Sequence, residues 1–177
     1  MLQKLFNTPA YSIGFITFIS AVCLASAFIA EAIFLLEPCE LCIYQRYPYA
    51  FVILLGLIGF TLRKRRIAAI GTLVLSSIAF LINSGIAFYH TGVEQHWWTS
   101  AVEGCANPFI EHDDSSKSIL ENLMSAPLGD CSVIPWQDPV LGLSMANYNI
   151  GVCFMLALFC LISAFKTKKH PPLLEES

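Results

Sequence analysis

Charged residues are scarce in this chain of 177 residues. They make up 13% of the sequence, whereas hydrophobic residues make up 56%, and the mean hydropathy is +0.64. A soluble domain of this length needs more polar surface, so the composition argues against a soluble protein. The apolar residues also form long unbroken runs, without the strict alternation of barrel strands, which excludes a membrane β-barrel.

Four apolar runs are long enough to cross a bilayer, which takes about 20 residues. They lie at residues 11–36, 43–62, 67–88 and 143–165. We expect a helix in each, because a lone segment in lipid satisfies its backbone polar groups only as a helix. The sequence therefore predicts one all-α membrane domain over residues 1–177, a four-helix bundle with one long loop at 90–142 between the third and fourth helices. Ala25-Ser26-Ala27 resembles a signal-cleavage site, but the apolar run continues to Leu36, which favours a membrane span.

Basic residues are nearly missing from one set of connections. The stretch 90–142 carries eight acidic residues and a single lysine, Lys117, and the link before the second span carries Glu37 and Glu40. Basic residues flank the opposite ends of the spans: Lys4, Arg63, Lys64, Arg65, Arg66, Lys166, Lys168 and Lys169. The positive-inside rule therefore predicts cytoplasmic termini, with the link 37–42 and the loop 90–142 outside.

Topology divides the seven cysteines into two groups. Four are expected on the outer side: Cys39, Cys42, Cys105 and Cys131. Three lie within apolar runs and are expected to be inert core thiols: Cys23, Cys153 and Cys160. An even number of cysteines in an oxidising compartment favours disulfides.

The segment Cys39-Glu40-Leu41-Cys42 is a CxxC motif between the first two spans. Its spacing allows a small disulfide ring, and the N-terminus of the following helix can stabilise a thiolate. We therefore expect Cys42, rather than Cys39, to ionise more readily. A bridge between Cys105 and Cys131 is either a staple worth roughly 3 kcal/mol or the second half of a redox relay.

Zinc binding by the four outer thiolates is the alternative for this pattern. The second pair lacks CxxC spacing, and no histidine lies within a few residues of either pair. Both observations argue against a metal site, so no metal is expected.

Three motifs together resemble the disulfide bond formation protein B (DsbB) family. Pro38-Cys39-Glu40-Leu41-Cys42-Ile43-Tyr44-Gln45-Arg46 resembles its signature, and Tyr89-His90-Thr91-Gly92-Val93-Glu94 resembles the start of its periplasmic loop. Gly129-Asp130-Cys131, Trp136 and Leu141-Gly142-Leu143-Ser144-Met145 resemble the end of that loop. Four spans, cytoplasmic termini and four outer cysteines complete the resemblance.

The resemblance implies a quinone-dependent dithiol oxidase of the bacterial inner membrane, which supports protein disulfide formation. Cys105 matches the cysteine that forms a mixed disulfide with a periplasmic thioredoxin-fold oxidase of the DsbA type, and Cys131 matches its loop partner. Cys39 and Cys42 match the pair that passes electrons to quinone, with Cys42 at the quinone ring. Ubiquinone is the expected quinone, and menaquinone is the alternative. Membrane lipid is also an expected partner, whereas nucleic acid is not expected to bind.

Three polar residues near the outer ends of the spans are further candidates. Arg46 lies one helical turn after Cys42, where its charge can stabilise a thiolate and a reduced quinone, and it matches a quinone-tuning arginine of the family. His90 resembles a histidine near the family's quinone site, or it is an interfacial helix-end histidine. Glu31 is either a proton relay or an acid that pairs locally.

The chain departs from the family pattern in two places. The first is the loop stretch Glu111-His112-Asp113-Asp114, whose acidity leaves a general or a dedicated partner open. The second is Pro48, which is expected to kink the second span. Apart from these departures, the segment Ile119–Met124 either lies on the membrane surface or packs on the bundle.

Two other classes of protein remain open: a membrane metal-binding module that uses Cys39 and Cys42, and a tetraspan protein whose loop is merely stapled. A vitamin-K-epoxide-reductase-like protein is disfavoured, because its CxxC is expected on the last span.

Overall fold

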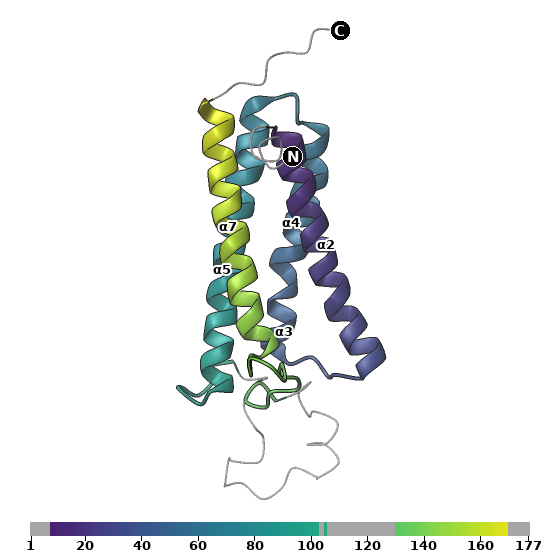
Figure 1. Cartoon of the computed structure of the whole chain (residues 1–177), viewed down its shortest axis with the longest axis vertical. Coiled ribbons are helices and arrows are strands. Elements are labelled where there is room, and N and C mark those ends of the chain that lie inside the picture. The colour runs from purple at the N-terminus through teal and green to yellow at the C-terminus, as the bar shows by residue number, and fades with distance from the viewer. Residues whose placement is uncertain (1–7, 103–104, 106–129, 170–177) are drawn as a thin grey trace, which may run out of the picture.

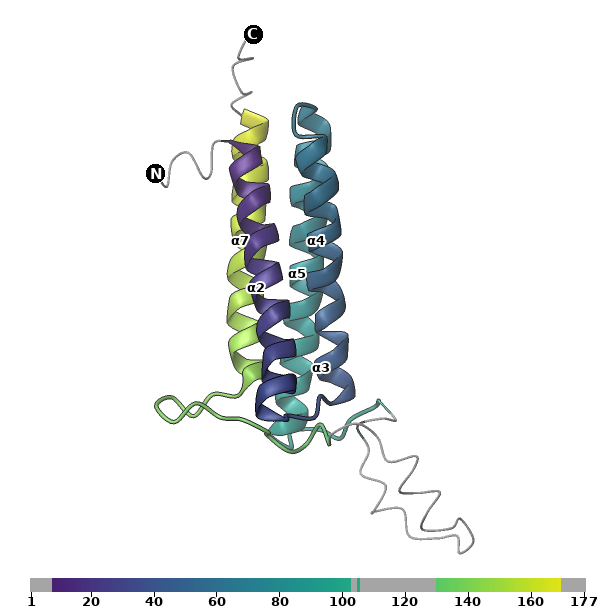
Figure 2. The ribbon, with the colours of Figure 1, turned by 90° about the vertical axis from the view of Figure 1, so that its right-hand side faces the viewer.

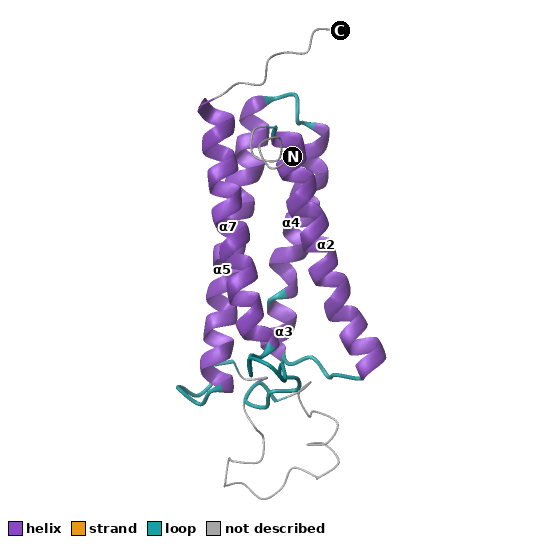
Figure 3. Ribbon diagram, viewed as in Figure 1, coloured by secondary structure: helices purple, strands orange, loops and turns teal. Residues whose placement is uncertain are grey.

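The computed structural model describes residues 8–102, 105 and 130–169, and every regular element in these residues is a helix. The helices are α2 (Pro9–Phe34), α3 (Glu40–Tyr44), α4 (Arg46–Thr61), α5 (Arg66–Glu94) and α7 (Met145–Lys169), shown in Figures 1 and 3. Four helical segments are long and apolar enough to cross a membrane, with α3 and α4 together forming one. The predicted all-α four-helix membrane fold is confirmed. The expectations for residues 111–114 and 119–124 lie outside the described residues.

The interior of the bundle combines small and polar side chains with large apolar ones such as Phe80 and Leu73, and many other large apolar side chains face outward. Helices α5 and α7 pack along their length and α2 packs on α4 (Figures 1 and 2). Ser77 Oγ donates to the Ala157 carbonyl of α7 at 3.0 Å, whereas Ile67 and Phe165 are exposed. This distribution suits lipid, where helices associate through close packing and hydrogen bonds because apolar burial gives no net gain.

Two glycines let α4 approach both neighbouring helices. Gly56 faces Thr17 of α2, and a Cβ atom at Gly56 would overlap the Thr17 hydroxyl. One turn on, a Cβ atom at Gly59 would lie 2.6 Å from Thr72 Oγ1 of α5. Small residues at such crossings set the helix separation in membranes. Helix α4 is therefore held in contact with both α2 and α5.

The second span is interrupted at Gln45, between α3 and α4. Pro48 lies three residues further on, and its ring removes an N–H and crowds the carbonyl of Tyr44, four residues earlier. The regular helix therefore breaks just before the proline. The interruption sets α3, which begins within the CxxC motif, apart from the long α4.

Helix α5 continues to Glu94, four residues beyond position 90, where the sequence predicts the start of the outer loop. Trp98 folds back over this last turn: it stacks on Tyr89 at 5.9 Å between ring centroids and covers Gly92. These contacts between side chains extend the helix, and a hydropathy pattern does not report such contacts. The prediction that the loop begins at residue 90 is therefore wrong: His90 and Glu94 lie one turn apart on α5.

Replacing Gly56 with alanine should destabilise the bundle, and replacing Gly71 should not. Alanine favours a helix over glycine by about 1 kcal/mol at either position. At Gly71 nothing lies within 4 Å of the added Cβ atom, whereas at Gly56 it overlaps Thr17, an overpacking that costs about 1–3 kcal/mol. Thermal unfolding in detergent should give a lower Tm for G56A only. Equal Tm values would show that the α2–α4 crossing does not depend on Gly56.

Candidate functional site

The CxxC motif lies at the start of α3. Cys39 is the N-cap residue, and its sulfur accepts a hydrogen bond from the Cys42 backbone N–H at 3.3 Å. That N–H is one of the helix's first donors, which have no partner within the helix. The two sulfur atoms lie 2.7 Å apart, with Cys39 donating to Cys42. The helix start therefore holds both sulfurs side by side.

The two thiols of this pair are not equivalent. Hydrogen bonding to Cys42, followed by burial, raises the pKa of the Cys39 thiol above its ordinary value. Cys39 therefore holds its proton more strongly than an ordinary thiol, and it is the donor in the contact between the two sulfurs.

His90 of α5 contacts this pair from the neighbouring helix. Its Nε2 atom lies 3.5 Å from Cys39 Sγ, and Glu94 Oε1 lies 3.7 Å from the same nitrogen. The other Glu94 oxygen accepts a hydrogen bond from Ser144 Oγ at 2.5 Å. The side chains of His90, Glu94 and Ser144 are all buried. The imidazole is thus fixed between a sulfur and a carboxyl group.

A chain of hydrogen bonds runs from His90 into the bundle. Gln45 Nε2 lies 2.9 Å from His90 Nδ1, and Asn149 Nδ2 donates to Gln45 Oε1 at 2.6 Å. Tyr49 donates to Asn149 Oδ1 at 2.5 Å, and its hydroxyl lies 3.1 Å from Cys153 Sγ. Buried polar groups are costly unless paired, and here they pair with one another. The chain links α5, α4 and α7 at the depth of the site.

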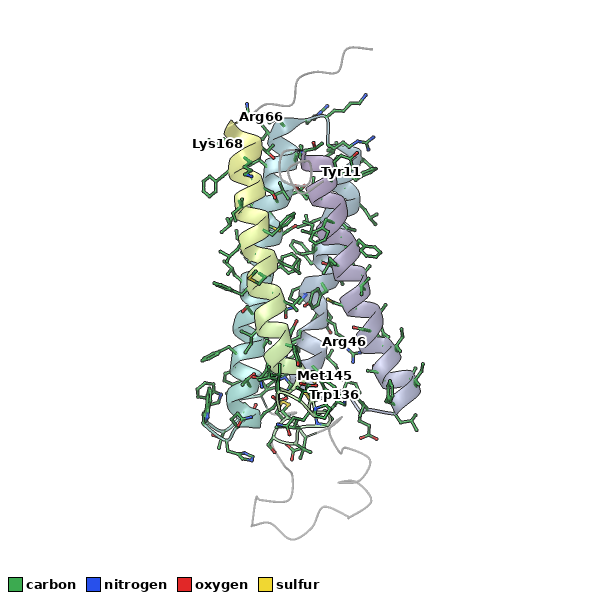
Figure 4. All side chains as sticks on the ribbon, viewed as in Figure 1. Tyr11, Arg46, Arg66, Trp136, Met145 and Lys168 are labelled. Atoms are coloured by element: carbon green, nitrogen blue, oxygen red, sulfur yellow. A yellow bond between two sulfur atoms is a disulfide. The ribbon has the colours of Figure 1, made fainter. Side chains whose placement is uncertain are left out.

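Arg46 begins α4, one turn beyond Cys42. Its guanidinium donates to Glu31 Oε2 of α2 at 2.8 Å and lies 5.0 Å from the centroid of the Phe28 ring. The acid within the first span is therefore paired locally, the second of the two alternatives for Glu31. Figure 4 shows Arg46 toward the Met145 end of the bundle, opposite Arg66 and Lys168. The ion pair joins α2 to α4 beside the sulfurs.

A cavity of about 360 Å³ lies between α2, α4, α5 and α7 at this end. Cys42, Arg46 and Glu31 contribute polar atoms to its wall, and Leu24 and Val152 are among its apolar residues. Ligand pockets of roughly 300 Å³ and above commonly combine an apolar wall with a few oriented polar groups. The cavity is therefore suited to a small molecule with an apolar body and a few polar atoms.

The second cysteine pair lies against the first. Cys105 and Cys131 form a disulfide, and both belong to a buried cluster with Cys39, against which Cys42 packs. A second cavity, of about 310 Å³, is lined by Cys39 and Cys42 together with Asp130. The CxxC motif thus lies between a cavity within the bundle and one beside the loop.

The structure brings together all the site residues expected from the sequence. Cys39, Cys42, Cys105 and Cys131 share one cluster, while Arg46 and His90 line the same cavity as Cys42. Two expectations need correction. A histidine does approach the CxxC pair, because α5 folds against α3 and brings in His90 from 51 positions away. Cys23 is half-buried and lines the cavity, unlike the buried Cys153 and Cys160.

Sequence reasoning missed the residues that orient His90. The imidazole is contacted directly by Gln45 and Glu94. Asn149 holds Gln45, and Tyr49 holds Asn149. A signal was present, because polar side chains within otherwise apolar spans are functional candidates by default. Gln45 and Asn149 both meet that description.

Comparisons with known proteins agree with this geometry. The model of the family described as "Disulfide bond formation protein DsbB" matches residues 10–163. The chain is similar to disulfide bond formation protein B of Xylella fastidiosa, at 32% identity over 82% of this chain and 86% of that protein. It is similar to the same protein of Xanthomonas euvesicatoria, at 33% identity over 76% and 77% of the two chains. An uncharacterised Rickettsia prowazekii protein, RP370, is 30% identical over 86% of each.

The family match covers most of the chain and both cysteine pairs. It agrees with four membrane-spanning helices and with a CxxC motif beside a buried loop disulfide. The chain therefore belongs to the DsbB family of disulfide bond formation proteins, and it is a disulfide oxidoreductase of the inner membrane.

Proposed function

We propose that this protein reoxidises a periplasmic dithiol oxidase of the DsbA type and passes the electrons to a membrane quinone. One observation carries the proposal: the loop disulfide and the CxxC pair share a buried cluster whose Cys42 also lines the cavity in the bundle. A thiol–disulfide relay needs this contact between two pairs, because each exchange requires one sulfur to reach another.

The first exchange takes place at the loop disulfide. A thiolate of the partner attacks Cys105, and Cys131 leaves as a thiolate. The partner's second thiol then attacks its own sulfur in the mixed disulfide. The partner departs with a disulfide, and Cys105 and Cys131 are left as thiols.

The second exchange moves the disulfide between the two pairs. Cys131 attacks Cys39 of an oxidised CxxC pair, and Cys42 leaves as the thiolate. Cys105 then attacks Cys131, which restores the loop disulfide and releases Cys39 as a thiol. The structure has this arrangement of bonds, with Cys105 joined to Cys131 and with Cys39 and Cys42 not joined.

The cavity beside Cys42 fits a quinone head group by its composition and volume. A quinone accepts two electrons and two protons, which balances the oxidation of one dithiol to a disulfide. Arg46 provides a positive charge at this wall, held by Glu31, where negative charge develops. His90 lies close enough to Cys39 to accept its proton when the disulfide re-forms. Ubiquinone is the quinone we propose, with menaquinone as the alternative.

The charge pattern supports a periplasmic position for the cysteines. The N-terminal end of α2 and the C-terminal end of α7 lie at the same end of the bundle as the turn between α4 and α5, and α3, which carries Cys42, lies at the other end (Figure 1). Applied to this arrangement, the positive-inside rule puts the basic end and both termini in the cytoplasm.

Neither alternative class explains both cysteine pairs. A stapled tetraspan protein requires only the loop disulfide and gives no reason for a CxxC pair packed against it. A module that must bind metal to function gives no reason for the loop disulfide.

Replacing Cys42 or Cys105 with serine should abolish turnover, because each substitution removes one sulfur of a different pair. The assay is the quinone-dependent oxidation of a reduced DsbA-type protein by the purified protein in detergent. C160S, at a fully buried thiol remote from the cavity, is the matched control and should retain activity. Turnover by either C42S or C105S would rule out the two-pair relay.

Neutralising Arg46 should weaken the reaction with quinone. A hydrogen bond to a charged group is worth about 1.5–3 kcal/mol, so R46Q should lower kcat/KM for quinone roughly 10- to 100-fold. E31Q should have a smaller effect, because it loosens Arg46 without removing its charge. R63Q, in the turn at the other end of the bundle, is the control. An unchanged kcat/KM in R46Q would mean that Arg46 serves only to anchor the helix.

The raised pKa of Cys39 should appear in the pH dependence of its alkylation. In the reduced protein, labelling of Cys39 by iodoacetamide should rise only above the ordinary thiol pKa of about 8.5. In C42A the hydrogen bond that holds the proton on Cys39 is lost, so the midpoint should fall. Peptide mass spectrometry measures the pH at which the rate of alkylation is half-maximal. Burial slows alkylation at every pH and does not move this midpoint. A midpoint that is the same in both proteins would contradict the proposed order of ionisation.

A further inference from the structure

We propose that the reduced CxxC pair and His90 form a binding site for one thiophilic divalent cation such as Zn²⁺, which holds the dithiol out of the reaction. The ligand atoms of Cys39, Cys42 and His90 all lie within 4.8 Å of one another. Two thiolates and an imidazole are the donors that zinc and cadmium prefer. The inhibitory consequence rests on the proposed function, whereas the binding itself does not.

The separations of these atoms suit a tetrahedral ion with little movement. Zinc–sulfur and zinc–nitrogen bonds of about 2.3 and 2.0–2.1 Å require about 3.5 Å between sulfur and nitrogen. Cys39 Sγ and His90 Nε2 are 3.5 Å apart. The sulfurs, now 2.7 Å apart, must separate by about 1 Å to reach tetrahedral spacing. Rotation of the Cys42 side chain toward either adjoining cavity supplies this change.

His90 can present a free Nε2 atom because its hydrogen-bond chain can be reversed. Metal binding needs the proton on Nδ1, so Gln45 must turn its amide oxygen toward that atom. Asn149 then reverses its amide and donates to Tyr49, which donates to Cys153 Sγ in turn. After this reversal every hydrogen bond of the chain still joins a donor to an acceptor, and the distances between the atoms need not change. An oriented second nitrogen is the usual support for a histidine ligand.

Charge and access also favour a cation here. Two thiolates neutralise a divalent ion, and the buried Glu94 carboxyl lies 3.7 Å from His90 Nε2, which places an acidic group beside the site. The 310 Å³ cavity leads to Cys39, Cys42 and His90 and has Asp130 in its wall. A cation can therefore approach from the loop side without entering the cavity in the bundle.

Metal binding and the disulfide exclude each other, because the ion binds the two thiolates and the oxidised pair has none. Binding releases the two thiol protons to water and moves no electrons. The bound dithiol cannot be oxidised until the ion leaves. The site therefore exists only in the reduced protein and would stop turnover at that stage.

The test is a titration of the full-length protein with Cd²⁺, followed by the ultraviolet cadmium–thiolate absorption. A C105S/C131S background leaves Cys39 and Cys42 as the outer thiols, and a phosphine reductant prepares the dithiol. We expect one Cd²⁺ per chain in the reduced form, none in the disulfide form, and displacement by Zn²⁺. C42S should abolish binding.

Two asparagine substitutions decide whether His90 is a ligand. H90N should weaken Cd²⁺ binding at least roughly 10-fold, whereas H96N, at an exposed histidine with left-handed backbone, should not. Absence of saturable binding, or equal affinity in H90N and the parent, would overturn the proposal. If H90N loses helical content, the cadmium NMR shift of the parent decides instead, because coordination without nitrogen would overturn the proposal.

A separate arm tests the consequence for turnover. In the wild-type protein, Zn²⁺ should slow quinone-dependent turnover, and a chelator should restore it. Zinc that binds the reduced protein without slowing turnover would overturn the inhibitory role. The titrations contain neither quinone nor partner, so a failure of the proposed function would leave their outcome unaffected.

Discussion

The imidazole of His90 joins the sulfur chemistry to the interior of the bundle. One ring nitrogen faces Cys39 and Glu94, and the other faces Gln45, from which hydrogen bonds continue through Asn149 to Tyr49. In a membrane these polar groups have no water to replace a lost partner, so each holds the next in place. The position of the CxxC pair relative to α4, α5 and α7 depends on this chain.

The same constraint explains why the bundle is built from small and polar contacts. Apolar side chains gain nothing by leaving lipid, so Gly56 and Gly59 bring backbones together, and serine hydroxyls donate across α5 and α7. At the CxxC end, α2 is joined to α4 by the ion pair between Arg46 and Glu31. Helices α2 and α4 are in close contact at Gly56, and toward the CxxC end the Arg46–Glu31 ion pair joins them, which leaves room for the cavity.

The two cavities give the CxxC pair access in two directions. Cys42 lines both, one within the bundle and one that has Asp130, the chain neighbour of Cys131, in its wall. Cys39 is buried, holds its proton more strongly than an ordinary thiol and contacts His90, whereas Cys42 is half-buried. This asymmetry suits a pair that exchanges with a protein disulfide on one side and with an apolar acceptor on the other. It also makes the reduced pair a set of metal ligands.

Local sequence determined the four helices, the charge asymmetry and the identity of the four outer cysteines, because long apolar runs, basic clusters and a CxxC spacing are properties of neighbouring residues. It also placed Arg46 on the same side as Cys42, since a helical turn relates them. Only the tertiary structure decided that His90, 51 positions from Cys39, contacts it, that Glu31 pairs with Arg46, and that Gln45 and Asn149 meet. Those contacts depend on how the helices cross, which is set by glycine positions and buried polar groups acting together rather than by any one segment.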